Sequence, residues 1–342
     1  MTTPTPLRLG TRRSALATTQ SERVAHALRA RGHEVELVAI STLGDTSTHQ
    51  LTTIGGTGVF AAAIRGRLLD GTVDLAVHSL KDLPVASEPG LVVAAVPPRD
   101  DPRDVLVARD GLTLGELPNA STVGTGSPRR ESQLRGLGLG LDVTPVRGNV
   151  DTRIGFVHSG SLDAVVLARA GLARLGLLGE VTETLDPLQM LPAPGQGALA
   201  VECRVDRSDL VAALAELDDP DSRICVTAER ALLAALEAGC MAPVGALAEI
   251  VEGEDGLELS LRAVVGSRDG SVLLRRSIVA SVHHPQDAGR RLADLLLEDG
   301  AADLDVDDPP DRPPGHPPDG VKRHSSLIPA PHRTPSDTEQ VS

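Results

Sequence analysis

Short apolar runs alternate with longer amphipathic stretches through the first hundred residues. This alternation predicts strands and helices in turn, which is typical of an α/β unit built on a parallel sheet. The predicted strands are LRLGTR, VELVAIS and the run that begins at residue 74, and the predicted helices extend from Ser14 to about Arg31 and through FAAAIRGRLLDG. A cluster of prolines and charges, PPRDDPRD, then interrupts the pattern and is interpreted as a hinge.

The alternation restarts after this hinge. The predicted strands of the second unit are DVLVAR, STVGTG, DVTPVR and DAVVLAR, and its helices are expected to begin near Ser127, Asn149 and Ala170. A further run, GALAVECR at 197–204, has the pattern of another buried strand and is expected to return to the first sheet. The chain would then cross twice between two lobes.

From about Asp219 the pattern changes to a long helix, a hairpin, LELSLRAVVGSRDGSVLLRRSIVA, and a final helix, which predicts a small α+β domain. The predicted fold class is α/β, with two periplasmic-binding-protein-like lobes, a cleft between them and this C-terminal domain. The predicted domain limits are 5–98 with 199–217 for the first domain, 103–194 for the second, 219–301 for the third and 302–342 for a disordered proline-rich tail.

The stretch DLAVHSLKDLPV, at 74–85, begins with the apolar residues of a buried strand and ends in a cluster of polar residues. Its apolar positions, through Leu80, are typical of a strand inside a parallel sheet. The polar residues His78, Ser79, Lys81 and Asp82 gather at its C-terminal end. In open α/β sheets ligands bind at that edge, so Lys81 and Asp82 become candidate functional residues.

Composition narrows the possible partners. The chain has two Phe, no Trp and no Tyr, so a base-stacking nucleic-acid surface is not expected. Its formal net charge of -14 also disfavours a polyanion, because a phosphate backbone requires a basic face. The N-terminus lacks a signal-peptide pattern, and no stretch has the roughly 20 apolar residues that span a bilayer. We therefore expect a cytoplasmic protein that binds neither nucleic acid nor membrane.

Among the 33 basic residues only Lys81 and Lys322 are lysines. The excess of arginine is most simply a matter of genome composition. Against that background Lys81 is conspicuous beside Asp82. A functional site could require lysine here because its compact ammonium needs less room than a guanidinium. The alternative is that this position is a lysine by chance, without a functional reason.

The cysteines Cys203, Cys225 and Cys240 are odd in number and lack metal-type spacing. No disulfide framework and no metal site are therefore predicted. Cys203 and Cys225 fall in a predicted strand and a predicted helix, where inert core residues are expected. Cys240 lies in EAGCMAPVG on a predicted loop, and the residues alone leave open whether it is functional.

Three predicted strand-to-helix turns combine small or hydroxyl residues with arginine, at 11–14, 125–130 and 147–153. A helix N-terminus offers free N–H groups and a partial positive charge, and arginine adds a planar fork that suits carboxylates. If only one turn had this composition, its Ser or Asn would be interpreted as a helix cap and its arginines as solvated surface charges. Because three turns share it, the sequence favours a ligand with several negative groups that binds to all of them. Carboxylate is favoured over phosphate because no GxGxxG or GxxxxGKS/T loop is present.

Five segments, taken together, resemble the porphobilinogen deaminase family, also called hydroxymethylbilane synthase. They are HSLKDLP, GSPRR, VRGNVDTR, PAPGQGALAVECR and EAGCMAPVG, and the resemblance runs from about Leu7 to Ala301. The family is a transferase that joins four porphobilinogen molecules head to tail with loss of ammonia. It then releases hydroxymethylbilane by hydrolysis, in tetrapyrrole and haem biosynthesis. The resemblance implies this activity, a monomer, and three domains with the catalytic Asp in the cleft between the first two.

The resemblance also implies roles for individual residues. Cys240 would carry a dipyrromethane cofactor through a thioether, and Asp82 would be the catalytic residue, facing pyrrole nitrogens where positive charge develops as ammonia leaves. The other residues that would hold the cofactor are Lys81, Ser127, Arg129 and Arg130. The residues that would bind the substrate porphobilinogen are Arg12, Ser14, Thr125, Arg147, Arg153, Arg174 and Gln196.

The sequence departs from the family pattern at three places. Thr57 in IGGTGVF replaces a frequent lysine of a lid segment, and Gly126 replaces a frequent serine, which removes a hydroxyl. The proline-rich tail lies outside the pattern altogether. Two other functions fit the same lobes: a binding module for a small dicarboxylate and, less well, a phosphate-transferring enzyme.

Overall fold

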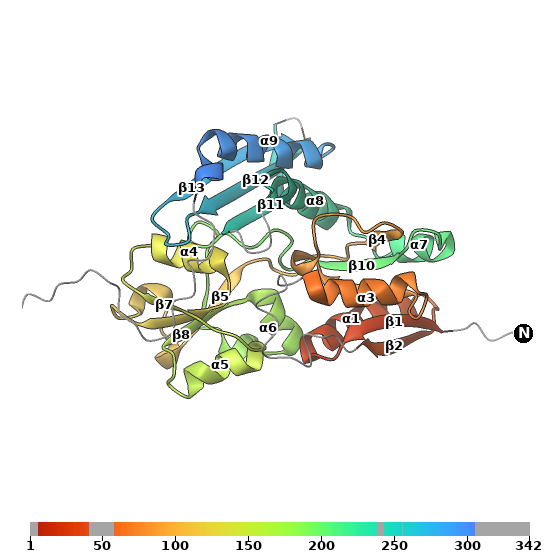
Figure 1. Cartoon of the computed structure of the whole chain (residues 1–342), viewed down its shortest axis with the longest axis horizontal. Coiled ribbons are helices and arrows are strands. Elements are labelled where there is room, and N and C mark those ends of the chain that lie inside the picture. Colours follow the sequence, from red (N-terminus) through yellow and green to blue (C-terminus); the bar gives the residue numbers. More distant parts are fainter. Residues whose placement is uncertain (1–5, 41–57, 238–242, 255, 305–342) are drawn as a thin grey trace, which may run out of the picture. The chain divides into compact units, whose positions relative to one another are not determined.

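The computed structural model describes residues 6–40, 58–237, 243–254 and 256–304, which form three sheets with flanking helices (Figure 1). The first sheet has the strand order β2-β1-β3-β10-β4. Its strands are β1 (Leu7–Arg12), β2 (Val35–Ile40), β3 (Leu75–Ser79), β4 (Leu91–Ala95) and β10 (Leu199–Arg204). The predicted return of 197–204 to this sheet is confirmed, whereas β4 is absent from the sequence prediction.

Strand β10 runs against its neighbours. β1 pairs in parallel with β2 and β3, as predicted, but β10 pairs antiparallel with β3 and β4, so the sheet as a whole is mixed. The reason lies in the connection. β10 enters from the second lobe beside the carboxyl end of β3, where Leu199 pairs with Ser79, and it therefore has to run back along β3.

The second sheet repeats this plan with the order β7-β6-β8-β5-β9. Its strands are β5 (Asp104–Ala108), β6 (Thr122–Thr125), β7 (Asp142–Pro145), β8 (Ala164–Ala168) and β9 (Glu183–Thr184). β6 is parallel to β7 and β8, while β5, the strand that arrives from the first lobe, is antiparallel to β8 and β9. The strand that crosses between lobes is therefore the reversed strand in both sheets.

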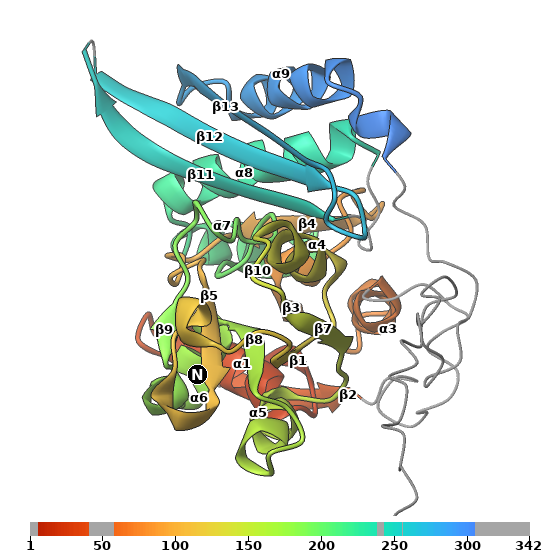
Figure 2. The same cartoon turned by 90° about the vertical axis from the view of Figure 1, so that its left-hand side faces the viewer.

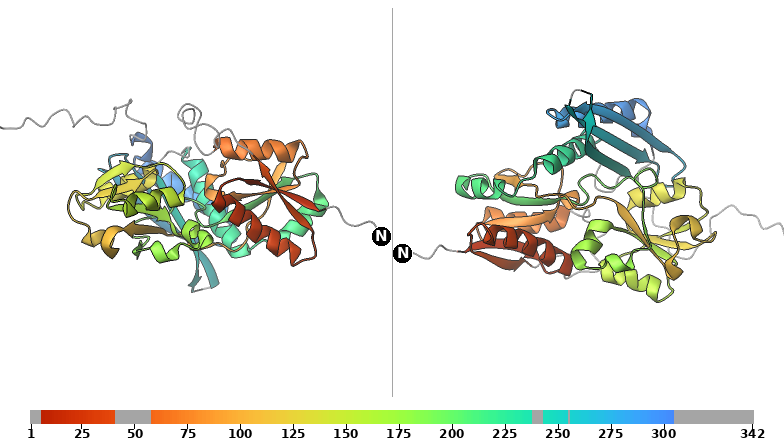
Figure 3. Two further views of the ribbon diagram at one scale, coloured as in Figure 1. Left: turned by 90° about the horizontal axis from the view of Figure 1, so that it is seen from below. Right: turned by 180° about the vertical axis from the view of Figure 1, so that it is seen from behind.

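Helices cover both faces of each of these two sheets. The helices are α1 (Ala15–Arg29), α3 (Gly58–Leu69) and α7 (Ser208–Ala215) on the first sheet, and α4 (Pro128–Gly136), α5 (Val150–His158) and α6 (Arg169–Leu175) on the second. α1 and α7 bury Leu28 and Leu214 on one face of the first sheet, and α3 buries Leu68 on the other (Figure 3). On the second sheet, Leu134 of α4 and Ile154 of α5 enter separate cores.

The third sheet is antiparallel and has both of its helices on one face (Figure 2). Its elements are α8 (Pro220–Ala235), β11 (Val244–Gly253), β12 (Gly256–Gly266), β13 (Leu273–Ser281) and α9 (Pro285–Glu298). Leu232 of α8 and Leu292 of α9 pack against Leu261 of β12 in one core. The predicted hairpin is confirmed as β12 and β13, and β11 adds a strand that the sequence prediction lacks.

Short 3-10 turns complete the described part of the chain: η1 (Leu80–Asp82), η2 (Arg109–Gly111), η3 (Leu114–Glu116), η4 (Leu178–Glu180) and η5 (Ala301–Asp303). The predicted α/β class with a smaller C-terminal α+β part is confirmed, while the exact domain limits stay a prediction. Of the predicted tail, residues 305–342 lie outside the described residues. In the described part of the chain, no helix combines the length and the apolar character needed to cross a membrane.

Candidate functional site

A cavity of about 650 Å³ lies between the first and second sheets, and we call it the interlobe cavity. Its lining comes from the segments that follow β1, β3, β6, β7 and β8 and from the loop before β10. The predicted edge of the sheets is therefore where the cavity forms. Asp151 is the one carboxylate among its described lining residues. The basic residues that line it are Arg12, Lys81, Arg130, Arg147, Arg153 and Arg174.

The first turn places a capped helix at this cavity. Ser14 is the N-cap of α1, and its Oγ accepts a hydrogen bond from Ala17 N at 3.3 Å. Arg12 and Ser14 both line the interlobe cavity, as predicted for a ligand site. Gln20, six residues beyond Ser14 in α1, also lines the cavity while its Nε2 donates to Ser79 Oγ at 2.9 Å. Sequence reasoning missed Gln20, because a single polar residue on a helix carries no signal of where it faces.

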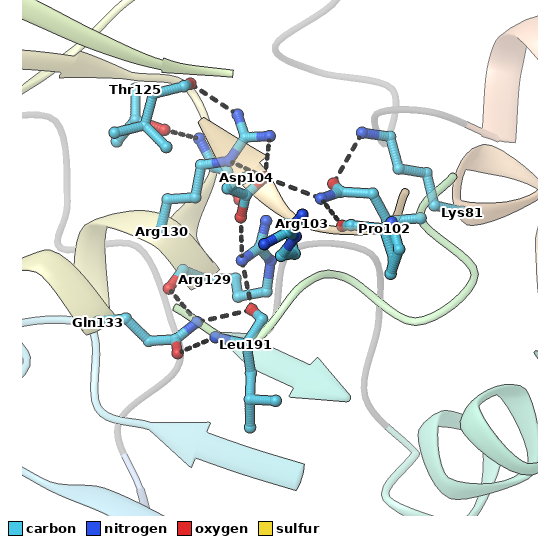
Figure 4. Close-up of polar contacts among 12 residues, drawn as sticks. Lys81, Pro102, Arg103, Asp104, Thr125, Arg129, Arg130, Gln133 and Leu191 are labelled. Carbon is cyan, nitrogen blue, oxygen red and sulfur yellow. Dashed lines mark hydrogen bonds and ion pairs between the residues drawn. The ribbon is translucent and has the colours of Figure 1, made fainter. Parts of the chain in front are cut away.

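Arg129 and Arg130 begin helix α4 and meet the same buried carboxylate, Asp104 (Figure 4). Arg130 Nη2 lies 2.8 Å from Asp104 Oδ1, and Arg129 Nη1 lies 2.8 Å from Asp104 Oδ2. Both side chains are buried, at 4 % and 5 % exposed, but Arg130 lines the interlobe cavity, whereas Arg129 is absent from the lining and donates to Leu191 O at 2.6 Å. The two neighbouring arginines therefore differ in their access to a ligand.

Asp104 is fully buried and was missed by the sequence analysis. Burial alone would raise the pKa of this carboxyl, but Arg129 and Arg130 outweigh burial and hold the pKa well below its usual range. Asp104 is therefore a fixed negative charge behind the cavity. A signal existed in DVLVA, since a buried apolar strand that opens with a carboxylate implies a buried cationic partner.

Gln196 links this cluster to Lys81. Its Nε2 donates to Asp104 Oδ1 at 2.8 Å and to Pro102 O at 2.7 Å, and its Oε1 accepts from Lys81 Nζ at 3.2 Å. Desolvation lowers the pKa of Lys81 to about 8, against the opposing effect of the neighbouring Asp82. Because Lys81 and Gln196 both line the cavity, an ammonium that is easily deprotonated faces the ligand space.

Three further arginines reach the cavity in different ways. Arg174 Nε donates to Asp100 Oδ2 at 2.8 Å, and its Nη2 donates to Gly197 O at 2.6 Å. Arg153 Nε donates to Gly148 O at 2.9 Å, and burial lowers its pKa, as does the nearby positive charge of Arg130. Arg147 is exposed at the third turn.

Asp82 lies at the end of η1, just after β3. The sequence prediction that the strand continues through Leu80 is wrong, because Leu80 N donates to Ala198 O and Leu83 N donates to Leu80 O, which closes a 3-10 turn. Asp82 lines a separate small pocket of about 140 Å³. That pocket shares Arg12, Gln20 and Ser79 with the interlobe cavity, so the carboxylate stands at its border.

The remaining predicted residues stand apart from the lining. Thr125 is buried, and its Oγ1 accepts a hydrogen bond from Ser127 N at 3.2 Å. Ser127 occupies the N-cap position of α4 as predicted, but its side chain makes no capping hydrogen bond. A Cβ on Gly126 would meet the backbone oxygen of Val146 at 2.6 Å, so this backbone cannot accept the family's frequent serine without moving.

Two of the three cysteines, Cys203 and Cys225, are core residues, as the sequence predicted. Cys203 in β10 and Cys225 in α8 are buried, and burial raises the pKa of each thiol to about 11. Both are therefore protonated and unreactive near neutral pH. Cys240 and Thr57 lie outside the described residues.

Comparison with known proteins gives consistent matches. Residues 7–212 match the family model described as porphobilinogen deaminase, dipyromethane cofactor binding domain, and residues 223–298 match that of the C-terminal domain. The porphobilinogen deaminase of Mycobacterium tuberculosis (strain ATCC 25618 / H37Rv) is 61% identical over 303 residues, covering 87% of this chain and 98% of the relative. The porphobilinogen deaminase of Mycobacterium marinum (strain ATCC BAA-535 / M) is 59% identical over 303 residues, covering 87% of this chain and 96% of the relative.

Among solved structures, the periplasmic aliphatic sulphonate binding protein SsuA from Escherichia coli is similar with a TM-score of 0.37. The two chains are 16% identical, and the likeness covers 69% of this chain and 71% of that one.

Proposed function

The chain belongs to the porphobilinogen deaminase family, and from this premise we propose how its interlobe cavity serves the reaction. The enzyme is a transferase that joins four porphobilinogen molecules with loss of ammonia and releases hydroxymethylbilane by hydrolysis. Each porphobilinogen carries an acetate and a propionate. The growing chain therefore gains carboxylates at every step, and a cavity whose charged lining residues are six cations and a single carboxylate suits such a ligand.

The same cavity suits the dipyrromethane cofactor. When bound, this group supplies the primer to which the product chain is attached. Its carboxylates would meet Arg130 and Lys81, which face the cavity, and the hydroxyl of Ser127, which is not used as a helix cap. Arg129 would act from behind by fixing Asp104, since its own guanidinium is buried against that carboxylate.

The substrate carboxylates would be held by the remaining cations of the lining. Arg147 is the most open of them and is suited to engage an incoming or elongated ligand. Arg153 and Arg174 have their guanidinium groups bonded to the carbonyls of Gly148 and Gly197 and would hold fewer orientations of the ligand. Arg12 lines the cavity beside Ser14. Ser14, Thr125 and Gln196 would assist, with Gln196 bonded directly to Lys81.

Asp82 would stabilise the positive charge that develops on the substrate pyrrole as ammonia leaves. A carboxylate fixed beside the reacting nitrogen lowers the barrier because its charge is already in place before the reaction begins. It can also accept and return a proton at its oxygen. The position of Asp82 at the border between the small pocket and the interlobe cavity supports this role.

Oligomeric state, compartment and partners belong to the proposal as well. We propose a cytoplasmic monomer that binds no nucleic acid, in line with the formal net charge of -14. The domain limits predicted above are proposed together with it.

The intact mass of the purified protein tests the cofactor assignment. If Cys240 carries the primer, the mass should exceed the sequence mass by two porphobilinogen units less two ammonias. A thioether survives denaturation, whereas a bound ligand is lost. Cys240→Ser should return the mass to that of the bare chain and abolish turnover, because a hydroxyl is a much weaker nucleophile than a thiol.

Cys203→Ser and Cys225→Ser are the matched controls, since both thiols are buried and protonated. Both should keep the added mass. A wild-type protein from a haem-producing host that shows only the bare sequence mass would contradict the assignment of Cys240.

A further inference from the structure

Arg230 of helix α8 reaches out of the third sheet's helix layer to the turn that carries Lys81 and Asp82. Its Nη2 donates to Pro84 O at 2.7 Å, and its Nη1 lies 3.0 Å from Leu83 O and 3.4 Å from Leu80 O. These carbonyls flank the two functional side chains on either side. A charged donor that bonds several carbonyls of one turn fixes its backbone more firmly than a neutral donor would.

The apolar side chains of the turn are anchored by the same helix. Leu80 and Leu83 are buried in one cluster with Val226, which lies one helical turn before Arg230 on α8. Residues four apart lie on the same helix face, so Val226 and Arg230 form one contact surface. α8 therefore holds both the side chains and the carbonyls of the turn.

The opposite side of the turn faces the ligand. Lys81 lines the interlobe cavity and Asp82 lines the small pocket, whereas Leu80 and Arg230 line a groove of about 300 Å³ between α8 and β4. The turn is thus supported from behind by α8 and presents its charged side chains forward. A displacement of about 1 Å in such a support is enough to lower catalytic rates strongly.

We propose that Arg230 is a positioning residue for the reaction, which fixes the backbone of residues 80–84 and thereby the placement of Lys81 and Asp82. This inference rests on the proposed roles of those two residues. It gives helix α8, which packs in the core of the third sheet, a direct part in shaping the site.

Arg223 provides a matched control on the same helix. Its Nη2 donates to the carbonyls of Val93 and Ala94, its Nε donates to Asp218 Oδ2, and it lines the same groove as Arg230. It therefore makes the same kind of bonds, but to strand β4 and not to the turn. Both arginines are half-buried and bonded to backbone carbonyls, but only loss of Arg230 releases the turn.

The test compares Arg230→Leu, Arg230→Lys and Arg223→Leu as cofactor-loaded enzymes, by porphobilinogen consumption and by thermal unfolding. Arg230→Leu should lower kcat by on the order of 10- to 100-fold with a nearly unchanged KM, because the cavity arginines remain. Arg230→Lys should recover part of kcat. Arg223→Leu should stay within about twofold of wild type.

A second measurement is independent of turnover. The amide of Leu83 donates to Leu80 O, so its hydrogen exchange should accelerate in the Arg230 variants and stay slow in Arg223→Leu. Equal kcat in both leucine variants, or a loss of kcat that only follows the loss of thermal stability, would overturn the proposal. If Arg230→Leu does not fold, Arg230→Lys decides by the same two measurements. An inactive wild-type enzyme would instead contradict the proposed function.

Discussion

Lys81 Nζ donates a hydrogen bond to Gln196 Oε1 at 3.2 Å, and this contact joins the turn after β3 to the loop that leads into β10. Gln196 Nε2 in turn donates to Asp104 Oδ1, the carboxylate that holds Arg130. A lysine of the first lobe is thereby connected to an arginine of the second through buried neutral and acidic groups. Two cations of the interlobe cavity, Lys81 and Arg130, are thus held in place by one network.

Asp82→Asn is expected to fold normally and to lose turnover by on the order of 10³-fold, because the amide cannot stabilise the positive charge that forms as ammonia leaves. Release of ammonia under saturating porphobilinogen measures this effect. Asp110→Asn, at an exposed carboxylate in η2, is the control and should keep full turnover. Unimpaired turnover in Asp82→Asn would remove its assigned role.

The value of kcat/KM should fall as the pH rises through about 8. Lys81 has a pKa lowered to about 8, so it is positive below that pH and neutral above it, and only the positive form holds the carboxylates of the primer to which the substrate is joined. Since kcat/KM reports groups of the free enzyme, initial rates at low porphobilinogen between about pH 7 and pH 9.5 measure this step. Lys81→Arg, which stays charged throughout, should lack the fall. If kcat/KM of Lys81→Arg falls over the same pH range, the fall is due to the titration of a group other than Lys81.

Arg147→Leu should stall elongation at short enzyme-bound intermediates without loss of stability. Arg147 is exposed and lines the cavity, so its removal weakens the hold on accumulating carboxylates and leaves the core intact. Native mass spectra of the enzyme after limited porphobilinogen would show the intermediates. Arg204→Leu, which removes an exposed arginine-aspartate pair at the end of β10, should give the wild-type distribution. A wild-type distribution in Arg147→Leu itself would contradict the assignment.

Asp104→Asn should lower the free energy of unfolding by roughly 3–5 kcal/mol, because it leaves Arg129 and Arg130 buried without their counter-ion. Urea denaturation at neutral pH measures the change. Glu22→Gln breaks an ion pair with Arg29 whose two side chains are about half exposed, and it should leave the unfolding midpoint almost unchanged. Equal midpoints for both variants would show that the buried pair adds little to stability.

The sequence by itself determined the features that depend on neighbouring residues. Alternating apolar runs predicted most strands and helices of both lobes, and Ser14 and Asn149 cap α1 and α5 because a short side-chain oxygen reaches the N–H groups two or three residues ahead. The turns that follow β1, β6 and β7 were expected to bind a ligand with several negative groups, because each combines small or hydroxyl residues with arginine. Arg12, Arg130 and Arg147 from these turns do reach the interlobe cavity.

Only the tertiary structure decided what depends on residues far apart in the chain. The reversed direction of β10 and β5 follows from how the chain crosses between lobes, and no local pattern encodes it. The role of Asp104 depends on Gln196, 92 residues away, and Arg230 meets Pro84 across 146 residues.

Arg129 and Arg130 show this division most directly. The sequence makes them equivalent neighbours, and both were expected to bind the same ligand. Successive residues of a helix point about 100° apart, so two neighbours leave the helix in different directions and tertiary packing decides what each one meets. The packing of α4 against β5 and the loop at Leu191 buries both guanidinium groups on Asp104, which compensates both charges, and only Arg130 also borders the interlobe cavity.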